Sequence, residues 1–469
     1  MDGGEYLPAV ADAVERTRAG DALFVLGLQL DPDTDLRGRD PGEEGYLPVG
    51  EMLARAAARG VDVRVLLAGS VFTSGLPLKV GPFAANVAAA AALRRWIPDG
   101  ARGEPPLADR VVLDWSGHRL GSNHQKAIVV GGQGQLVAFV GGIDLAPGRW
   151  DLPPHGSMER AGEPWGWHDA GQRLVGPAAT DVWNVVRERW RDAASLPARP
   201  AWYREGGLGP LNPRPLPAEP GPPPEVARRE GGGITVSVLR SYGPWKQHPP
   251  PPAPRRPWTH RPRGGVREIF ATLSKAIDAA RLYVYVEDQY FREYPGGDRD
   301  YELYPQLRDA AARGVRVLLL GSGVGRPDDV RGGEVNRELT ADVRDKIVAQ
   351  LPEDRRHNVA VYRVERVTVH SKVVLVDDRF ACIGSANLFS RSMAGTDHEL
   401  SVAVVDAGSR VRDLRIRLWS DHLRCDPDDP EVRRRLADAT RSLGEWRDSW
   451  GTPGYRPIGR GPALKLVGP

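Results

Sequence analysis

A pair of short motifs, one in each half of the chain, constrains the fold more than any other feature. His124-Gln125-Lys126 is followed by an apolar, strand-like run and then by Gly141-Gly142-Ile143-Asp144. His370-Ser371-Lys372 is followed by a similar run and then by Gly384-Ser385-Ala386-Asn387. Because both halves share the order and spacing of these segments, the sequence predicts a duplicated unit.

A second repeat supports the duplication. The stretch from Ala56 to Leu67 reappears from Ala310 to Leu319, and in each copy a glycine separates a helix-like pattern from a strand-like one. Helix-like and strand-like patterns also alternate in the first half, over residues 6–18, 22–28, 50–58 and 61–67. We therefore predict two pseudo-symmetric α/β halves, each a mixed β-sheet flanked by helices, with one shared active site at their interface.

Changes in composition predict where one half ends and the other begins. Residues 200–233 are dense in proline, glycine and arginine and are interpreted as a linker between halves 1–199 and 234–469. A second stretch rich in proline and arginine, residues 244–264, has the composition of polyproline segments. A solvated surface loop is the favoured interpretation of this stretch, with a docking site as the alternative.

Charge and cysteine content narrow the choice of partner and compartment. The 469 residues carry a formal net charge of only +3 without a long basic block, which argues against nucleic acid as the partner. The two cysteines, Cys382 and Cys425, are too few for a disulfide scaffold and favour a reducing cytoplasm. The N-terminus lacks the pattern of a secretory signal, and no apolar run reaches the roughly 18 residues of a membrane span. A lipid substrate would therefore be met from the water side, at a membrane surface.

The residue types in the paired motifs point to phosphodiester chemistry. Residues two apart in a strand face the same side, so each motif should present an imidazole beside an ammonium group. An imidazole can act as nucleophile or general acid near neutral pH, and lysine offers a positive charge to phosphate oxygens. Further along each half lies an acid, Asp169 or Glu399, next to a strand-like run. A carboxylate that accepts the Nδ1 proton of a histidine would fix its tautomer and raise its basicity.

The sequence contains none of the common metal-binding motifs. It has no paired-cysteine spacing, no His-Glu-x-x-His and no aspartate-rich calcium loop. We therefore expect catalysis without a metal or other cofactor. Lys126 and Lys372 would supply the positive charge in a partly desolvated site.

These motifs resemble the signature of the phospholipase D superfamily. In that signature His-x-Lys is followed, after four further residues, by aspartate, and the whole motif is present twice in the chain. The second copy is complete, with His370, Lys372 and Asp377. The first copy departs from the pattern, because Gly131 stands where the motif aspartate is expected. In the family this aspartate is chiefly structural, so the resemblance implies that the departure affects local rigidity more than chemistry.

The resemblance extends beyond the motifs and is closest to the phospholipases D that cleave phosphatidylcholine. It covers the chain from about residue 10 to residue 425. The segments that carry it are Gly141 to Leu145, Gly148 to Asp151, Pro164 to Asp169, Gly176-Pro177, Glu287 to Phe291, Arg391 to Met393, Leu414 to Trp419 and His422-Leu423.

The family resemblance implies a ping-pong reaction through a phosphohistidine. His124 would be the nucleophile, and His370 would protonate the leaving head group and then activate water, which a small alcohol can replace. Asp169 and Glu399 would orient the two histidines, in one pairing or the other. The residues expected to contact the substrate phosphate or line its site are Lys126, Lys372, Asn387, Asp144, Ser385 and Gly142.

The leading prediction is hydrolysis of phosphatidylcholine or a related glycerophospholipid to phosphatidic acid and free head group, with transphosphatidylation to alcohols as a companion activity. One alternative is a phosphodiesterase acting on nucleic acid or a soluble diester. The other is an eroded, lipid- or phosphate-binding protein, for which Gly131 would be the mark. A monomer would suffice, because one chain carries both motifs. Membrane contact would fall to residues 244–264 or to Trp165 and Trp167, although such tryptophans are more often part of a core.

Overall fold

The structure is a computed structural model, and its description covers most of both halves. The described residues are 1–69, 82–116, 121–132, 135–153, 155, 166–195, 212–213, 215–226, 233–243, 265–289, 299–322, 342–364, 367–448 and 464–466. The predicted linker 200–233 is covered only in part. The proline-rich stretch 244–264 and Trp165 lie outside the described residues.

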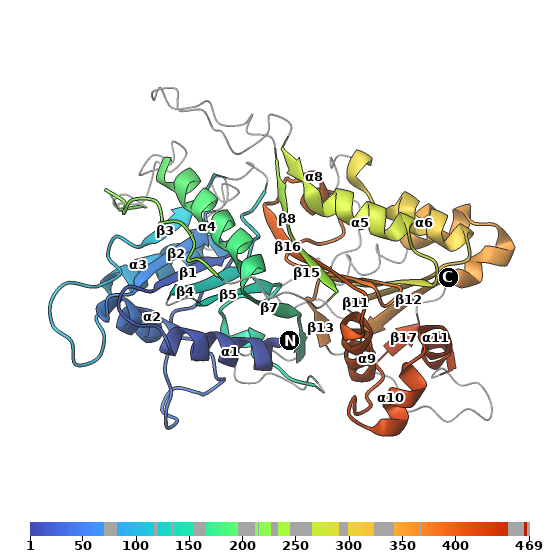
Figure 1. Cartoon of the computed structure of the whole chain (residues 1–469), viewed down its shortest axis with the longest axis horizontal. Coiled ribbons are helices and arrows are strands. Elements are labelled where there is room, and N and C mark those ends of the chain that lie inside the picture. Colours follow the sequence, from blue (N-terminus) through green and yellow to red (C-terminus); the bar gives the residue numbers. More distant parts are fainter. Residues whose placement is uncertain are drawn as a thin grey trace.

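Two mixed β-sheets with the same central topology form the two halves (Figure 1). The order in the first sheet is β3 (Val111–Asp114), β2 (Asp62–Ala68), β1 (Ala22–Gly27), β4 (Ala127–Gly132), β5 (Gln135–Gly141) and β7 (Gly171–Val175). The order in the second is β17 (Leu464–Leu466), β12 (Val359–Val364), β11 (Arg316–Ser322), β10 (Tyr283–Glu287), β14 (Val373–Val376), β15 (Phe380–Gly384), β16 (Glu399–Asp406), β8 (Ile234–Tyr242) and β9 (Val266–Arg267). In each sheet three parallel strands are followed by antiparallel ones, as in β3-β2-β1 with β4-β5-β7 and in β12-β11-β10 with β14-β15-β16. The predicted pair of α/β halves is confirmed.

Alternating apolar residues let each sheet pack helices on both faces. On β1, Leu23 and Val25 pack in one hydrophobic cluster with α1 (Gly3–Glu15), α2 (Val49–Ala58) and α3 (Pro82–Arg95). Phe24 and Leu26 point the other way, toward α4 (Pro177–Ser195). In the second half, one face of the sheet packs α5 (Glu268–Asp278) and α6 (Tyr304–Ala312), and the other packs α9 (Arg410–His422), α10 (Pro430–Leu436) and α11 (Ala439–Asp448), as Figure 1 shows.

The helix-to-strand repeat found in the sequence is a repeated turn in the structure. Gly60 follows α2 with a φ of 91°, and Gly314 follows α6 with a φ of 97°. Glycine adopts this left-handed conformation without the steric cost that a Cβ imposes. The turns lead into β2 and β11, which hold equivalent places in the two sheets.

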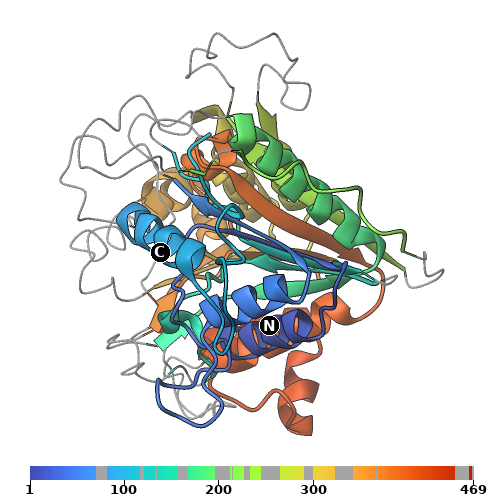
Figure 2. The same cartoon turned by 90° about the vertical axis from the view of Figure 1, so that its left-hand side faces the viewer.

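The two halves share a hydrophobic interface and a small sheet. Leu400 and Val402 of β16 belong to the same buried cluster as Ala138 and Val140 of β5. In addition, β6 (Gly166–His168) of the first half pairs in parallel with β13 (Val367–Val369) of the second. Figure 2 looks onto the first half, with the second half behind it. These contacts bring segments on either side of the predicted linker into one interior.

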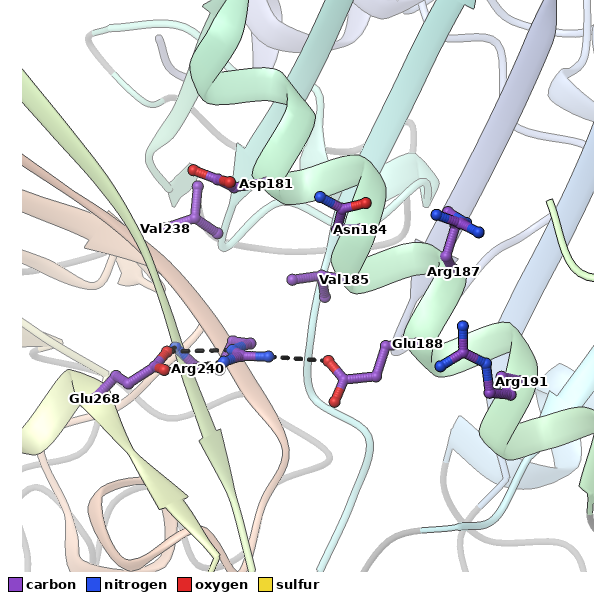
Figure 3. A pocket seen from close by; sticks show the side chains of 9 residues that line it. All are labelled: Asp181, Asn184, Val185, Arg187, Glu188, Arg191, Val238, Arg240 and Glu268. Carbon is purple, nitrogen blue, oxygen red and sulfur yellow. Dashed lines mark hydrogen bonds and ion pairs between the residues drawn. The ribbon is translucent and has the colours of Figure 1, made fainter. Parts of the chain in front are cut away.

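Polar contacts between the halves lie in a groove of about 550 Å³ between α4 and β8 (Figure 3). Arg240 on β8 donates to Glu188 of α4 at 3.0 Å and to Glu268, the first residue of α5, at 2.9 Å. The lining residues include charged side chains from α4 but none from the two His-x-Lys motifs. The groove is therefore separate from the predicted site.

Two features of the described residues bear on the helices and on Trp167. None of the helices in the ranges given above is long and apolar enough to cross a bilayer. Trp167, one of the two tryptophans considered for membrane contact, is only 3% exposed. The interpretation of this side chain as part of the interior is confirmed.

The glycine that replaces the first motif aspartate sits against a large side chain. A Cβ at Gly131 would lie 2.5 Å from Cζ3 of Trp183, a buried residue of α4. At the adjacent Gly132, a Cβ would lie 1.8 Å from an oxygen of Asp21. Two glycines thus make room for the indole and for the carboxylate at the start of β1.

Restoring the motif with Gly131→Asp is expected to destabilise the protein by about 2–3 kcal/mol, because it overpacks the contact with Trp183 and buries a charge. Urea unfolding followed by tryptophan fluorescence measures the effect. Gly221→Asp is the matched control, since a Cβ at Gly221 would meet nothing within 4 Å. Equal free energies of unfolding for the two variants would mean that α4 can shift away from residue 131 at little cost.

Candidate active site

Both His-x-Lys motifs lie in extended segments that end where a strand begins. β4 starts at Ala127 and β14 at Val373, in each case one residue after the lysine. Each motif therefore precedes a strand, as the sequence indicated, and the motif segments themselves pair across the interface rather than inside their own sheet. The lysines still fold back beside the histidines: Lys126 Nζ donates to the His124 carbonyl at 3.2 Å, and Lys372 Nζ donates to the carbonyl of His370.

Each motif histidine is held through its backbone by the other half. The N–H of His124 donates to the carbonyl of His398 at 2.9 Å, and the N–H of His370 donates to the carbonyl of His168 at 2.7 Å. The first bond belongs to the parallel bridge between Asn123 and His398, and the second continues the ladder between β6 and β13. The two arrangements are related as expected for a pseudo-twofold axis.

The side chains cross the interface in the same reciprocal way. Nδ1 of His124 lies 3.0 Å from Oε2 of Glu399, and Nδ1 of His370 lies 2.6 Å from Oδ2 of Asp169. Of the two pairings left open by the sequence, the structure thus contains the crossed one. A carboxylate at Nδ1 fixes the proton there and leaves Nε2 as the atom available for reaction.

Burial and a cluster of cations determine the electrostatics of the site. Burial raises the pKa of Asp169 to about 6, although the charges of Lys372, Arg149 and Lys126 act in the opposite direction. Burial lowers the pKa of Lys372 to about 8. Burial and the charges of Lys372, Arg149, Lys126 and His124 hold the pKa of His370 well below its usual range. Because groups of both halves act on His370, the two motifs contribute to one site, in which this imidazole is neutral before substrate binds.

These pKa shifts predict a bell-shaped pH profile for kcat, measured at saturating substrate. As the pH falls through about 6, protonation of Asp169 removes the acceptor for the His370 Nδ1 proton, so the rate should fall on the acid side. As the pH rises through about 8, Lys372 loses the charge that attracts phosphate, so the rate should fall on the alkaline side. Lys372→Arg keeps its charge and should carry the alkaline limb beyond about pH 9. A flat profile from about pH 5 to about pH 9 would contradict this assignment.

Neighbouring small residues hold the two carboxylates in place. The hydroxyls of Ser385 and Ser392 both donate to Glu399, and the Ser385 carbonyl lies 2.9 Å from His124 Nδ1. At Gly142 a Cβ would come within 2.2 Å of Asp169 Oδ1. The N–H of Gly142 donates a hydrogen bond to the carbonyl of Ala170. Ser385 and Gly142, predicted as substrate contacts, therefore lie against the residues that orient the histidines.

Asn387 and Asp144 occupy matching turns but have different surroundings. Asn387 is 2% exposed, and within the described part of the chain its Oδ1 makes no hydrogen bond. Asp144 accepts a hydrogen bond from the Gln29 backbone at 3.0 Å and lies 3.5 Å from Lys126 Nζ. The amide is thus the group with unused bonding capacity, whereas the carboxylate fixes the lysine.

Asp377, the intact motif aspartate, anchors the strand beside it. Its carboxylate accepts three backbone N–H groups, from Arg281 at 2.7 Å and from Leu282 and Tyr283 at 2.9 Å each. These residues lead into β10, so Asp377 fixes the start of the central strand. This placement agrees with the structural role that the family resemblance implies.

Arg149 is a residue of the site to which the sequence assigned no role. Its guanidinium lies 3.6 Å from the centre of the Trp167 ring, and this ring lies 4.9 Å from the imidazole of His370. Arg149 is 5% exposed, and its charge acts on both His370 and Asp169. The only sequence feature that pointed to Arg149 was its place in the run Gly148 to Asp151, which carries the family resemblance. That run does not show which side chains the arginine contacts.

Two family models match the chain, one in each half. The model described as "Phospholipase D" matches residues 17–163, and the one described as "Cardiolipin synthase, PLD-like domain" matches residues 273–416. These ranges include the first and second His-x-Lys motifs, respectively.

Known proteins similar to this chain include plant enzymes. Phospholipase D alpha 3 of Arabidopsis thaliana is 24% identical over 86% of this chain and 61% of its own length. Phospholipase D alpha 1 of Carica papaya is 23% identical over 96% of this chain and 68% of its own length. The chain thus spans about two thirds or less of these relatives.

Among solved structures, phosphatidylserine synthase of Haemophilus influenzae Rd KW20 has a similar fold. The TM-score is 0.53 at 11% identity, over 89% of this chain and 84% of that one. This similarity concerns the fold alone. Together with the two motif matches and the distant similarity to plant enzymes, it leads to one conclusion: the chain belongs to the phospholipase D superfamily, with two phospholipase D-like domains.

Proposed function

We propose that this protein is a phospholipase D that cleaves the head-group side of the phosphodiester in phosphatidylcholine or a related glycerophospholipid. The products are phosphatidic acid and the free head group. The observation that carries the proposal is the reciprocal arrangement in which Glu399 holds His124 and Asp169 holds His370. Lys126 and Lys372 place two positive charges in the same site, where phosphate oxygens need them.

The proposed reaction has two displacements at phosphorus. His124 Nε2 attacks, the bond from phosphorus to the head-group oxygen breaks, and His370 gives its Nε2 proton to that oxygen. A water molecule then transfers a proton to His370 Nε2 and attacks phosphorus, and the bond from phosphorus to His124 breaks. The end state restores both imidazoles, and an alcohol in place of water gives a phosphatidyl alcohol.

The acid role of His370 depends on the substrate. In the free site cations lower the pKa of this imidazole, so it starts neutral. The negative charge of a bound diester, together with the carboxylate of Asp169, opposes those cations and favours the protonated ring. Substrate binding would thus prepare the acid, which is why the site needs both lysines and both carboxylates.

Two observations favour a phosphatidyl lipid over nucleic acid. Relatives that match most of this chain are named as phospholipases D, and the net charge of the chain is only +3. Nucleic-acid binding usually needs a strongly basic surface, because the phosphate backbone supplies most of the affinity.

The test is head-group release from phosphatidylcholine vesicles with ethanol present, followed by mass spectrometry of the lipids. Release of choline together with phosphatidic acid and phosphatidylethanol is the expected result. Release without phosphatidylethanol would argue against the covalent intermediate. No release from any phosphatidyl lipid by folded protein, with cleavage of a soluble diester such as bis(p-nitrophenyl) phosphate, would replace the lipid substrate with a soluble one.

A further inference from the structure

A second group of histidines and carboxylates lies behind the catalytic pair. His155 Nε2, His168 Nδ1 and Asp421 Oδ2 converge on one point: the His155–Asp421 distance is 2.9 Å, the His155–His168 distance 3.2 Å and the His168–Asp421 distance 3.3 Å. His155 and His168 are 8% and 2% exposed, and the Asp421 side chain is 11% exposed. The histidines come from the first half and the aspartate comes from α9 of the second.

The far nitrogen of each imidazole also faces a carboxylate. Nδ1 of His155 lies 3.2 Å from Oδ2 of Asp151, and Nε2 of His168 lies 2.9 Å from Oε2 of Glu287. Each of these nitrogens must carry a proton to make that bond. In two neutral imidazoles the near nitrogens then have only lone pairs, which point at each other and at a carboxylate oxygen.

Two kinds of cation can occupy the space between the three atoms. A proton on His155 Nε2 can be donated to Asp421 and shared with His168 Nδ1, which makes His155 an imidazolium. One divalent ion satisfies all three atoms at once. Carboxylates on the far nitrogens of both histidines complete the pattern that commonly surrounds metal-bound histidine.

We propose that His155, His168 and Asp421 bind one Zn²⁺ ion. Two nitrogen donors and one carboxylate oxygen suit zinc, whose ligand atoms lie roughly 3.3 Å apart when bonds of about 2.0–2.1 Å are arranged tetrahedrally. A cavity of about 180 Å³, lined in part by His168 and Asp421, gives the ion a path of entry and gives water the fourth position.

The backbone at His155 is strained, and its neighbour Asp151 is anchored. His155 has a φ of 56°, a left-handed conformation that costs free energy for a residue other than glycine. Asp151 Oδ2, which faces the His155 ring, also accepts the N–H of Trp167 at 2.6 Å. Asp151 thus ties the His155 ring to β6, where His168 precedes the carboxylate that faces His370.

A neighbouring trio does not have these features. His168 and His422 each donate to a different oxygen of Glu287, both at 2.9 Å. Every atom there has an ordinary hydrogen-bond partner, so no cation is needed. The inferred ion therefore joins the two halves and positions β6.

The first test is metal content and stability of the whole chain, purified without a histidine tag. Elemental analysis of zinc-treated, desalted protein is expected to give one zinc per chain. Removal of the ion with 1,10-phenanthroline should lower Tm by at least about 5 °C, and ZnCl₂ should restore it. A content near zero, or a Tm that zinc leaves unchanged, would overturn the proposal whatever the catalytic activity of the sample.

The variants locate the ion. Asp421→Asn keeps the shape of a ligand but removes its charge, and it should lower zinc content at least about tenfold. Asp428→Asn, at an exposed position of the same region, is the matched control and should retain the ion. Full occupancy in Asp421→Asn would place the zinc elsewhere and contradict the assignment. If Asp421→Asn fails to fold, calorimetric titration of the stripped, unaltered protein with ZnCl₂ decides between one tight site and none.

Discussion

Replacing either His124 or His370 with alanine is expected to lower the rate of choline release by at least about 10⁴-fold. Loss of His124 removes the nucleophile, and loss of His370 removes the group that protonates the head-group oxygen. Because attack by His124 and proton transfer from His370 act together in one displacement, the double variant should be about as slow as either single variant. Steady-state release from short-chain phosphatidylcholine measures the effect.

The control for both variants is His357→Ala, which changes an exposed histidine in the turn Glu353–Asn358 and should leave the rate unchanged. Either catalytic variant retaining a tenth of the activity would contradict a mechanism that uses both histidines. Similar circular dichroism spectra and Tm values for all variants would exclude unfolding as the cause.

Asp169→Asn and Glu399→Gln are expected to lower kcat by about 10³–10⁴-fold each while KM stays nearly the same. An amide can present N–H to the imidazole and so favours the tautomer with its proton on the reacting nitrogen, as in Ser-His-Asp triads. Neither carboxylate is assigned a substrate contact, since their oxygens face His370 and His124.

Matched controls for these two variants are Asp428→Asn and Glu44→Gln, both at exposed positions. The controls should leave kcat within about twofold of the unaltered value. If kcat falls less than tenfold in either carboxylate variant, its histidine keeps the correct tautomer without the carboxylate. A rise in KM with an unchanged kcat would assign that carboxylate to substrate binding instead.

The repeats in the sequence were enough to predict the two halves, because periodicity and glycine turns report local structure. The glycine before β2 and the one before β11 adopt the same left-handed turn, as the shared segments indicated. The paired histidines were noticed for the same reason, since their spacing to a following strand recurs. Such features depend on residues that are close in the sequence, so they can be recognised in a single sequence.

What the sequence could not predict depends on contacts between distant segments. Either acid could have served either histidine, and only the pairing of β6 with β13 determines that Asp169 reaches His370. The absence of the aspartate at Gly131 looked like a loss, whereas the structure places the Trp183 indole in that space. Arg149 and the ligands of the inferred zinc site likewise come together only through tertiary packing.

A covalent intermediate on His124 tests the central claim most directly. The substrate is a phosphatidyl ester of p-nitrophenol, whose leaving group departs without a proton, and the protein is His370→Ala, which lacks the base needed to hydrolyse the intermediate. Digestion under alkaline conditions and mass spectrometry should find a phosphatidyl group on the peptide that contains His124. An adduct on another side chain, or none while the unaltered protein turns over the same substrate, would contradict the account.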